Sequence, residues 1–238
     1  MNEPNPYQSP VSLDRPPEQD GYYTSKLSAL RYAELWRTVD RWDHFVFAAI
    51  AKTLRLPLVS SFTFKAIEPL RLLDERELPD AAREKLLRVV QTCSELHLEF
   101  AFYCTGEFHG PTEAYAVHFL NQTGTTGLGT NWVRVRVRHV VKETLTSFAV
   151  TWLDDGTVLT TSNQRQRLDA PAIFQRMHLP GASVADLLRI HAERLQAIPS
   201  SRILPLDRDR LLERMNANKR IIASFHIRRG VWNSTPAA

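Results

Sequence analysis

The sequence predicts an α+β fold, in which an antiparallel meander of five to six strands is covered by helices packed on one face. Between about residues 96 and 162, apolar side chains recur at every second position, which is typical of half-buried strands. On both sides of this region they recur at every third or fourth position, as in amphipathic helices. Asp155-Gly156, between two alternating runs, is a strong signal for a two-residue hairpin turn.

The domain boundaries follow from local composition. Residues 1–21 are rich in Pro, Glu, Gln and Asp and bury too little apolar surface to fold, so we expect a disordered tail. Residues 22–232 are predicted to form a single α+β domain. Residues 233–238 are expected to be a loose C-terminal tail.

The region before the meander is predicted to contain a helix, a strand and a second helix. Residues 26–54 carry an aromatic-rich apolar stripe, which favours a helix buried against the sheet over a helix on a membrane surface. Residues 58–67 alternate and are predicted to form a strand. Residues 79–92 fit a helix, with Pro79 near its first turn.

The meander can be extended to a predicted register, because adjacent strands must keep their apolar residues on one side of the sheet. A tight turn is expected at Lys142-Glu143. The predicted inward-facing residues are Leu96, Leu98, Phe100, Phe102, Tyr115, Val117, Phe119, Val133, Val135, Val137, Phe148, Val150 and Trp152. The predicted pairs are Phe100 with Val117, Val117 with Val135, Val135 with Val150, and Trp152 with Leu159.

Two helices are predicted after the meander. Ser183 followed three residues later by Asp186 is typical of a helix N-terminus, and the apolar stripe continues to Leu195. A last helix is expected over residues 207–229, with Gly230 just beyond its end.

The overall composition is that of an ordinary globular protein rather than a polycationic one. The chain of 238 residues contains 30 Lys and Arg against 26 Asp and Glu, a formal charge of +4. No signal peptide and no apolar run long enough to span a membrane is visible. The two cysteines, Cys93 and Cys104, are too few for a disulfide framework. We therefore expect free thiols and a cytoplasmic location.

Two stretches resemble known proteins. The opening NPYQSP resembles the first residues of many uncharacterised bacterial proteins, and WLDDGTVLTTSN with LPGASVADLLRIHAERL resembles a segment of similarly uncharacterised ones. These stretches contain no catalytic motif. The resemblance implies a bacterial protein and brings no known activity with it.

The face opposite the predicted core carries the candidate binding residues. In NWVRVRVRH, arginines occupy every second position and point away from the valines between them. In the predicted register Glu99 lies opposite His118, and His118 opposite Arg134, a row of alternating charges. The candidate ligand-binding residues are Arg134, Arg136, Arg138, His118, Glu99, Tyr103 and Ser147.

Three interpretations of this face remain open. It is most simply a solvated sheet surface with cross-strand ion pairs. It is alternatively a surface for a small anion, because planar guanidinium groups suit carboxylate or phosphate. Nucleic acid is the least favoured partner, because Tyr103 is the only aromatic residue on the face.

The sequence marks no catalytic centre or metal site. Glu99 could orient His118 as a general base, but no nucleophile is marked by a motif. A zinc site is not expected, because His97 faces away from His118 and Glu99 in the predicted register. No cofactor is expected.

Two functions from different classes follow. The favoured one is a non-enzymatic soluble domain that acts through protein contacts, including a homodimer. The alternative is binding, or turnover, of a small anionic ligand on the face that carries the arginine row.

Overall fold

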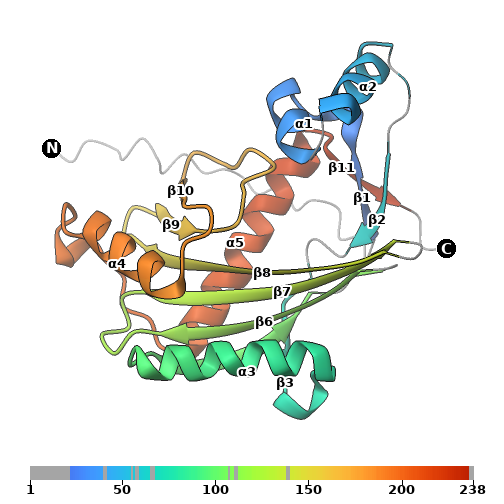
Figure 1. Ribbon diagram of the computed structural model, residues 1–238. Coiled ribbons are helices and arrows are strands. Elements are labelled where there is room, and N and C mark those ends of the chain that lie inside the picture. The colour runs from blue at the N-terminus through green and yellow to red at the C-terminus, as the bar shows by residue number, and fades with distance from the viewer. Residues whose placement is uncertain are drawn as a thin grey trace, which may run out of the picture.

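The computed structural model describes residues 22–39, 42–54, 56, 59–64, 68–106, 108–109, 112–137 and 140–235 (Figure 1). The predicted tail 1–21 lies outside the described residues, as does Arg138. The helices are α1 Tyr32–Thr38, α2 Trp42–Thr53, α3 Asp80–Glu95, α4 Val184–Leu195 and α5 Arg208–Arg228, with single 3-10 turns at Leu27–Ala29, Glu75–Glu77 and Ser200–Arg202. The strands are β1 Tyr22–Lys26, β2 Val59–Phe64, β3 Arg71–Leu73, β4 Glu99–Thr105, β5 Phe108–His109, β6 Thr112–Leu120, β7 Gly127–Val137, β8 Val140–Trp152, β9 Val158–Ser162, β10 Phe174–His178 and β11 Trp232–Thr235.

The fold is α+β, as predicted, and its larger sheet contains the predicted meander. Its described strands run in the order β10-β9-β8-β7-β6-β4-β3, and every neighbouring pair is antiparallel except β9 and β10. The prediction lacked the two outer strands, β3 and β10. A second sheet has the order β11-β1-β2-β5. Its strand β11 includes residues 233–235, where the sequence predicted a loose tail.

Helices cover both faces of the larger sheet rather than the predicted one face. Figure 1 shows α3 and α4 in front of the strands and α5 crossing behind them. The reason lies in β6, where both alternating sets are apolar. Val117 and Phe119 pack with α3, whereas Ala116 and Leu120 pack in the cluster that includes α5. A sheet whose strands are apolar on both sides requires cover on both sides.

The predicted register is wrong at β6–β7. Val117 pairs with Thr130 rather than with Val135, and Val135 pairs with Thr112. The register differs because the connection between β6 and β7 is tighter than expected. The Oδ1 atom of Asn121 closes this connection by accepting hydrogen bonds from the backbone amides of Thr125 and Thr126. The strand β7 can therefore begin at Gly127. This odd shift moves Val133 and Val135 to the face opposite Val117.

Two further pairings differ from the prediction. A register irregularity between Phe100 and Phe102 leaves Phe100 opposite Phe119 and places Tyr103, not Phe102, on the Val117 face. At the Asp155-Gly156 turn, Trp152 pairs with Val158 rather than with Leu159. A third difference is that Lys142 and Glu143 lie within β8 rather than in the predicted turn, so Val135 pairs with Lys142.

Local sequence signals fix the helix boundaries. The Ser183 side chain accepts a hydrogen bond from the Asp186 amide, which forms the expected capping box. Asp207 caps α5 in the same way, and Gly230 follows its end at a φ of 66°. The helix predicted over 26–54 is instead split. Arg31 is extended, and α1 begins directly after it at Tyr32. The Glu34 side chain caps this helix start by accepting a hydrogen bond from the Arg31 backbone amide.

Buried hydrogen bonds fix α4 to the sheet. The Nε2 atom of His191 lies 3.0 Å from Thr151 Oγ1, and its Nδ1 atom lies 2.9 Å from Thr161 Oγ1. Burial, assisted by nearby Arg194, lowers the pKa of His191 to about 4. The neutral ring therefore acts as a structural connector between α4, β8 and β9.

A buried ion pair joins α1 to the end of α5. The Glu34 side chain is fully buried and receives hydrogen bonds from Arg229 at 2.8 and 2.5 Å. It also accepts a hydrogen bond from the Asp169 backbone amide at 2.8 Å. Burial alone would raise the pKa of the Glu34 carboxyl, but these bonds outweigh it and lower the pKa to about 2. Asp169 in turn pairs with Arg31 and Arg37.

We expect Glu34→Gln to lower the free energy of unfolding by roughly 3–5 kcal/mol, because it leaves the half-buried Arg229 without its counter-ion. Urea unfolding at neutral pH measures the loss. The exposed pair Arg88–Glu84 provides the control, and Glu84→Gln should cost less than about 0.5 kcal/mol. Because the folded-state pKa of Glu34 is depressed, its contribution is complete above about pH 4.5 and is lost as the pH falls towards 2. Equal small losses in the two variants would contradict this assignment.

Candidate ligand-binding site

The arginine row predicted from the sequence does not form an assembled site. Arg134 donates from Nε and Nη2 to Glu143 at 3.0 and 2.8 Å and lies over the Trp132 ring. Arg136 is exposed opposite Val141, and Arg138 lies outside the described residues. The first arginine therefore already has a carboxylate partner within the sheet.

The other predicted site residues are dispersed over both faces. His118 is buried opposite Gly129, with its ring 4.9 Å from that of Phe102, and burial lowers its pKa to about 4. Tyr103 is buried on the opposite face, beneath α3. Ser147 is buried too, and its hydroxyl lies 2.8 Å from Thr130 Oγ1. Glu99 is exposed and pairs with Leu120. The predicted Glu99–His118–Arg134 row does not exist in the observed register.

A different site lies between α5 and the β8–β9–β10 edge of the sheet. There the structure contains a cavity of about 540 Å³, within the size range of small-molecule sites. We call it the α5 cavity. Its apolar lining consists of Leu70, Phe148, Val150, Leu168, Phe174, Met177, Met215, Ile222 and Trp232. Its polar lining consists of Thr160, Ser162, Gln164, Arg165, Gln166, Arg167, Arg176, His178, Asn218, Lys219 and His226.

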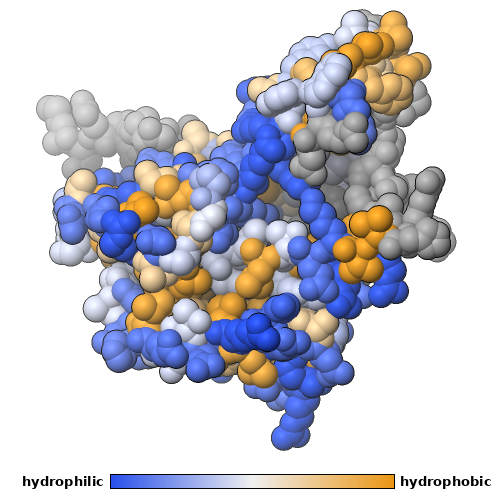
Figure 2. Space-filling model, viewed as in Figure 1, coloured by the Kyte–Doolittle hydropathy of each residue, from blue (hydrophilic) through white to orange (hydrophobic). Residues whose placement is uncertain are grey.

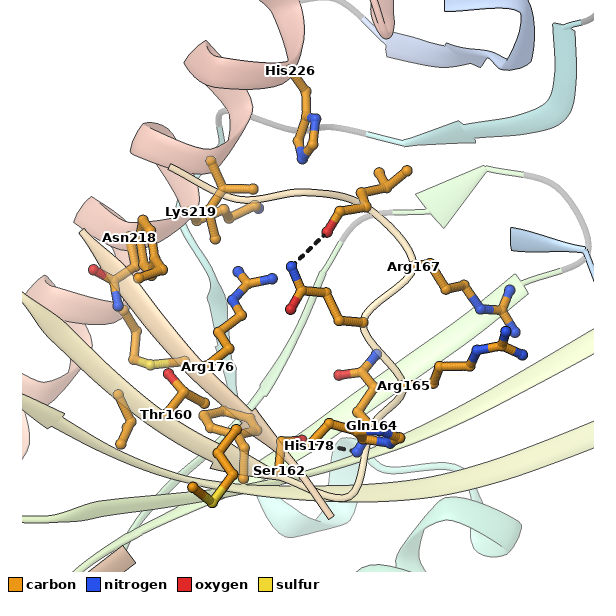
Figure 3. Close-up of a pocket in the computed structure, with 18 of the residues that line it drawn as sticks. Thr160, Ser162, Gln164, Arg165, Arg167, Arg176, His178, Asn218, Lys219 and His226 are labelled. Atoms are coloured by element: carbon orange, nitrogen blue, oxygen red, sulfur yellow. Dashed lines mark hydrogen bonds between the residues drawn. The ribbon is translucent and has the colours of Figure 1, made fainter. Parts of the chain in front are cut away.

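The fold brings these side chains together through three elements. Val150 on β8 pairs with Thr160 on β9, and Thr160 is opposite Arg176 on β10, so the three share one sheet face. Helix α5 forms the opposite wall with residues at three- and four-residue spacing. The loop after β9, residues 163–168, contributes the remaining side. Figure 3 shows Arg176 rising from the sheet and His226 descending from α5 into the same space.

Among the described residues, the charged side chains that line the cavity are basic. None of the described residues that line it is Asp or Glu. Within the described part of the chain, Arg165, Arg167 and Arg176 form no ion pair with a carboxylate. Arg176 is exposed as a whole residue, but its guanidinium lies over the Phe174 ring at 5.5 Å, where partial desolvation lowers its pKa. An unneutralised cation against an apolar wall favours an anionic ligand.

His226 supplies a buried polar atom at the helix side of the cavity. Its residue exposure is 2%, and its Nδ1 atom has no hydrogen-bond partner. The imidazole stacks on Trp232 with ring centroids 4.6 Å apart. Burial, reinforced by Arg229 and Arg176, lowers its pKa to about 4 despite the opposing effects of Glu34 and Asp169. His226 therefore lines the cavity as a neutral ring, while its Nδ1 atom is itself shielded from solvent.

Three further polar side chains of the lining are engaged in hydrogen bonds within the fold. Lys219 Nζ donates to the Glu68 carbonyl oxygen at 2.5 Å, and Asn218 Oδ1 accepts from Trp152 Nε1 at 3.3 Å. Ser162 Oγ donates to the Ser147 carbonyl oxygen and accepts from the Gln164 amide. Ser162 is opposite His178 across the β9–β10 pair, but its proton is committed to the backbone. The geometry supports recognition more directly than nucleophilic chemistry.

The sequence contained a weak signal for this site that our prediction did not use. Arginines alternate with glutamines in QRQR, residues 164–167, and a further basic stretch, FQRMH, follows at 174–178. The two basic stretches are separate in the sequence, and the parallel pairing of β9 with β10 brings them to the same cavity. That pairing could not be read from the alternation pattern alone.

Comparison of the chain with protein-family models, with curated proteins and with solved structures finds no match. Among the described residues, no three His, Cys, Asp or Glu side chains are grouped as metal ligands. In the same part of the chain no helix has both the length and the apolar character needed to cross a bilayer.

We expect the His226 ring to titrate near pH 4 in the folded protein, well below the ordinary value of 6.5. Between these two values the unfolded state binds a proton that the folded state does not, so stability falls as the pH falls. Replacing His226 with Gln should reduce the pH dependence of the free energy of unfolding by about 1.4 kcal/mol per pH unit in this window. Histidine NMR titration and urea unfolding at several pH values measure the two effects. A His226 midpoint close to 6.5 would contradict the burial of this ring.

Proposed function

We propose that this protein binds a small organic anion in the α5 cavity. The observation that carries the proposal is the unpaired guanidinium of Arg176, which enters an apolar cavity that has no acidic lining residue among those described. Arg165 and Arg167 of the neighbouring loop are exposed and extend away from Arg176 in Figure 3, so Arg176 is the cation that would meet the anion. The His226 ring adds a neutral aromatic surface at the helix side.

The lining defines the class of ligand. A carboxylate or phosphate group would pair with Arg176, because a guanidinium offers two parallel N–H donors to either anion. The body of the ligand would be apolar, because Phe148, Phe174 and Ile222 surround that position. A purely inorganic anion would leave this apolar surface unused.

Binding without turnover is the simpler function for this site, because the Ser162 proton is bonded to a backbone oxygen. The proposal moves the anionic-ligand hypothesis from the arginine row to the α5 cavity. Nucleic acid remains the least favoured partner, since the cations lie in one cavity rather than along a groove lined with aromatic residues. A bacterial cytoplasmic protein remains part of the proposal, supported by the free, buried thiols of Cys93 and Cys104.

Thermal-shift screening with aliphatic and aromatic carboxylates and phosphate monoesters tests the proposal. We expect at least one amphipathic anion to raise the melting temperature, and isothermal titration to give its Kd. Arg176→Gln should weaken that Kd by about tenfold or more, because a charge-assisted hydrogen bond contributes roughly 1.5–3 kcal/mol.

Arg136→Gln is the matched control, because Arg136 is exposed and lies on the predicted arginine row, outside the α5 cavity. The control should bind as the unchanged protein does. A loss of binding in Arg136→Gln with none in Arg176→Gln would refute the cavity and restore the arginine row. A complete absence of stabilising anions would refute both sites.

A further inference from the structure

Helix α2 is oriented with its small residues inward and its large apolar residues outward. Ala48 and Ala51 are buried, and Ala48 packs in the cluster that contains Leu30 and Leu35. On the outer side Trp42 is 71% exposed and Phe47 68% exposed. Solvated helices normally show the reverse pattern, with large apolar residues inside.

The outward residues form one continuous surface. Trp42, Val46, Ile50 and Leu54 follow one another at four-residue steps, so they make a ridge along one side of the helix. Phe47 lies beside this ridge. Trp36 of α1 extends it, since Trp36 contacts the Phe45 ring edge-to-face at 5.0 Å. We call Trp36, Trp42, Val46, Phe47, Ile50 and Leu54 the α2 patch. Figure 2 shows hydrophobic residues gathered over this projecting end of the molecule.

The size of the α2 patch is that of a protein interface. Its exposed fractions correspond to an apolar surface on the order of 700 Å², close to the roughly 800 Å² per partner of a standard interface. Isolated exposed apolar residues are common, but a continuous surface of this extent usually marks an interaction site.

Within α2 itself, between Arg41 and Arg55 of the sequence, the charges do not favour an acidic membrane. Between Trp42 and Thr53 the only lysine or arginine is Lys52. Its Nζ donates to the Ser28 carbonyl oxygen at 2.5 Å and lies over the Tyr32 ring, away from the patch. Helices that bind membrane surfaces normally flank their apolar side with lysine and arginine.

We propose that a second copy of this chain docks on the α2 patch, forming a dimer through a pair of crossed α2 helices. An isologous interface requires a patch that is complementary to itself, and a neutral apolar ridge meets this requirement. A two-fold axis near Ile50 places Ile50 against its symmetry equivalent. It also brings Val46 against the partner's Leu54. Ridges at four-residue spacing pack together in this way at the commonest helix crossing angle.

Sedimentation velocity and light scattering of the full chain over a range of concentrations test this interface. We expect a concentration-dependent dimer, and we expect Ile50→Glu to shift the equilibrium to monomer. Val140→Glu is the matched control, since Val140 is 67% exposed on β8 and lies outside the patch. Both substitutions are on exposed side chains, so both variants should retain the circular dichroism and melting behaviour of the monomer.

A cysteine at the proposed axis gives an independent measurement. Ile50→Cys should form a disulfide-linked dimer on mild oxidation, whereas the unchanged chain should not, because Cys93 and Cys104 are buried. A monomer at every concentration would overturn the proposal, as would a dimer that Ile50→Glu leaves intact. Co-sedimentation of monomeric protein with phosphatidylserine vesicles, lost in Ile50→Glu, would identify a membrane as the occupant instead and overturn it equally.

Discussion

Two hydrogen bonds to the side chain of Asn121 determine how the two sides of the larger sheet are composed. By accepting from the amides of Thr125 and Thr126, Asn121 closes the β6–β7 connection and lets β7 begin at Gly127. That starting point sets Val117 opposite Thr130 and sends the side chains of β6 and β7 to their respective faces. Since strand side chains alternate, a connection one residue longer would exchange the two faces of every later strand. The residues beneath α3 and those beneath α5 follow from this one turn.

Helix α5 is held near both ends, and the cavity lies along the stretch between. Near its N-terminus Leu211 packs closely against Gly127, where an added Cβ would lie 3.0 Å from the Leu211 side chain. Near its C-terminus Arg229 binds Glu34 of α1. Asp169, which follows the loop that contains Arg165 and Arg167, donates its backbone amide to the same Glu34 and pairs with Arg31. The walls of the cavity are thus fixed by interactions outside it, which leaves Arg176 available for a ligand.

The fold was predictable from the sequence to the extent that local signals governed it. The capping box at Ser183 and Gly230 beyond α5 each act over a few residues, and each lies where it was expected. The order of the meander was also predictable. Its register was not, because β6 is apolar on both faces and a face-matching argument then has two solutions. Gly129 made the register harder to predict, because glycine is typical of loops whereas this one lies within β7. In the structure it makes room for Phe148 and His118, which a Cβ would approach to 2.4 and 2.9 Å.

The candidate site was less predictable than the fold because its residues are distant in the sequence. Arg176 meets His226 only through the parallel pairing of β9 with β10 and the crossing of α5. The arginine row failed for a related reason, since it required His118 and Arg134 to share a face. Arg134 instead meets Glu143 through the β7–β8 pair.

The two cysteines lie on opposite sides of the larger sheet, Cys93 in the cluster with α3 and Cys104 in the cluster with α5. Burial raises the pKa of each thiol to about 12, and for Cys104 it outweighs the opposing effect of Lys219. Only the thiolate reacts with alkylating reagents, so neither sulfur is modified while its layer stays closed. The protein thus contains one chemical probe on each side of the sheet, and their labelling rates would report the opening of the two helical layers separately.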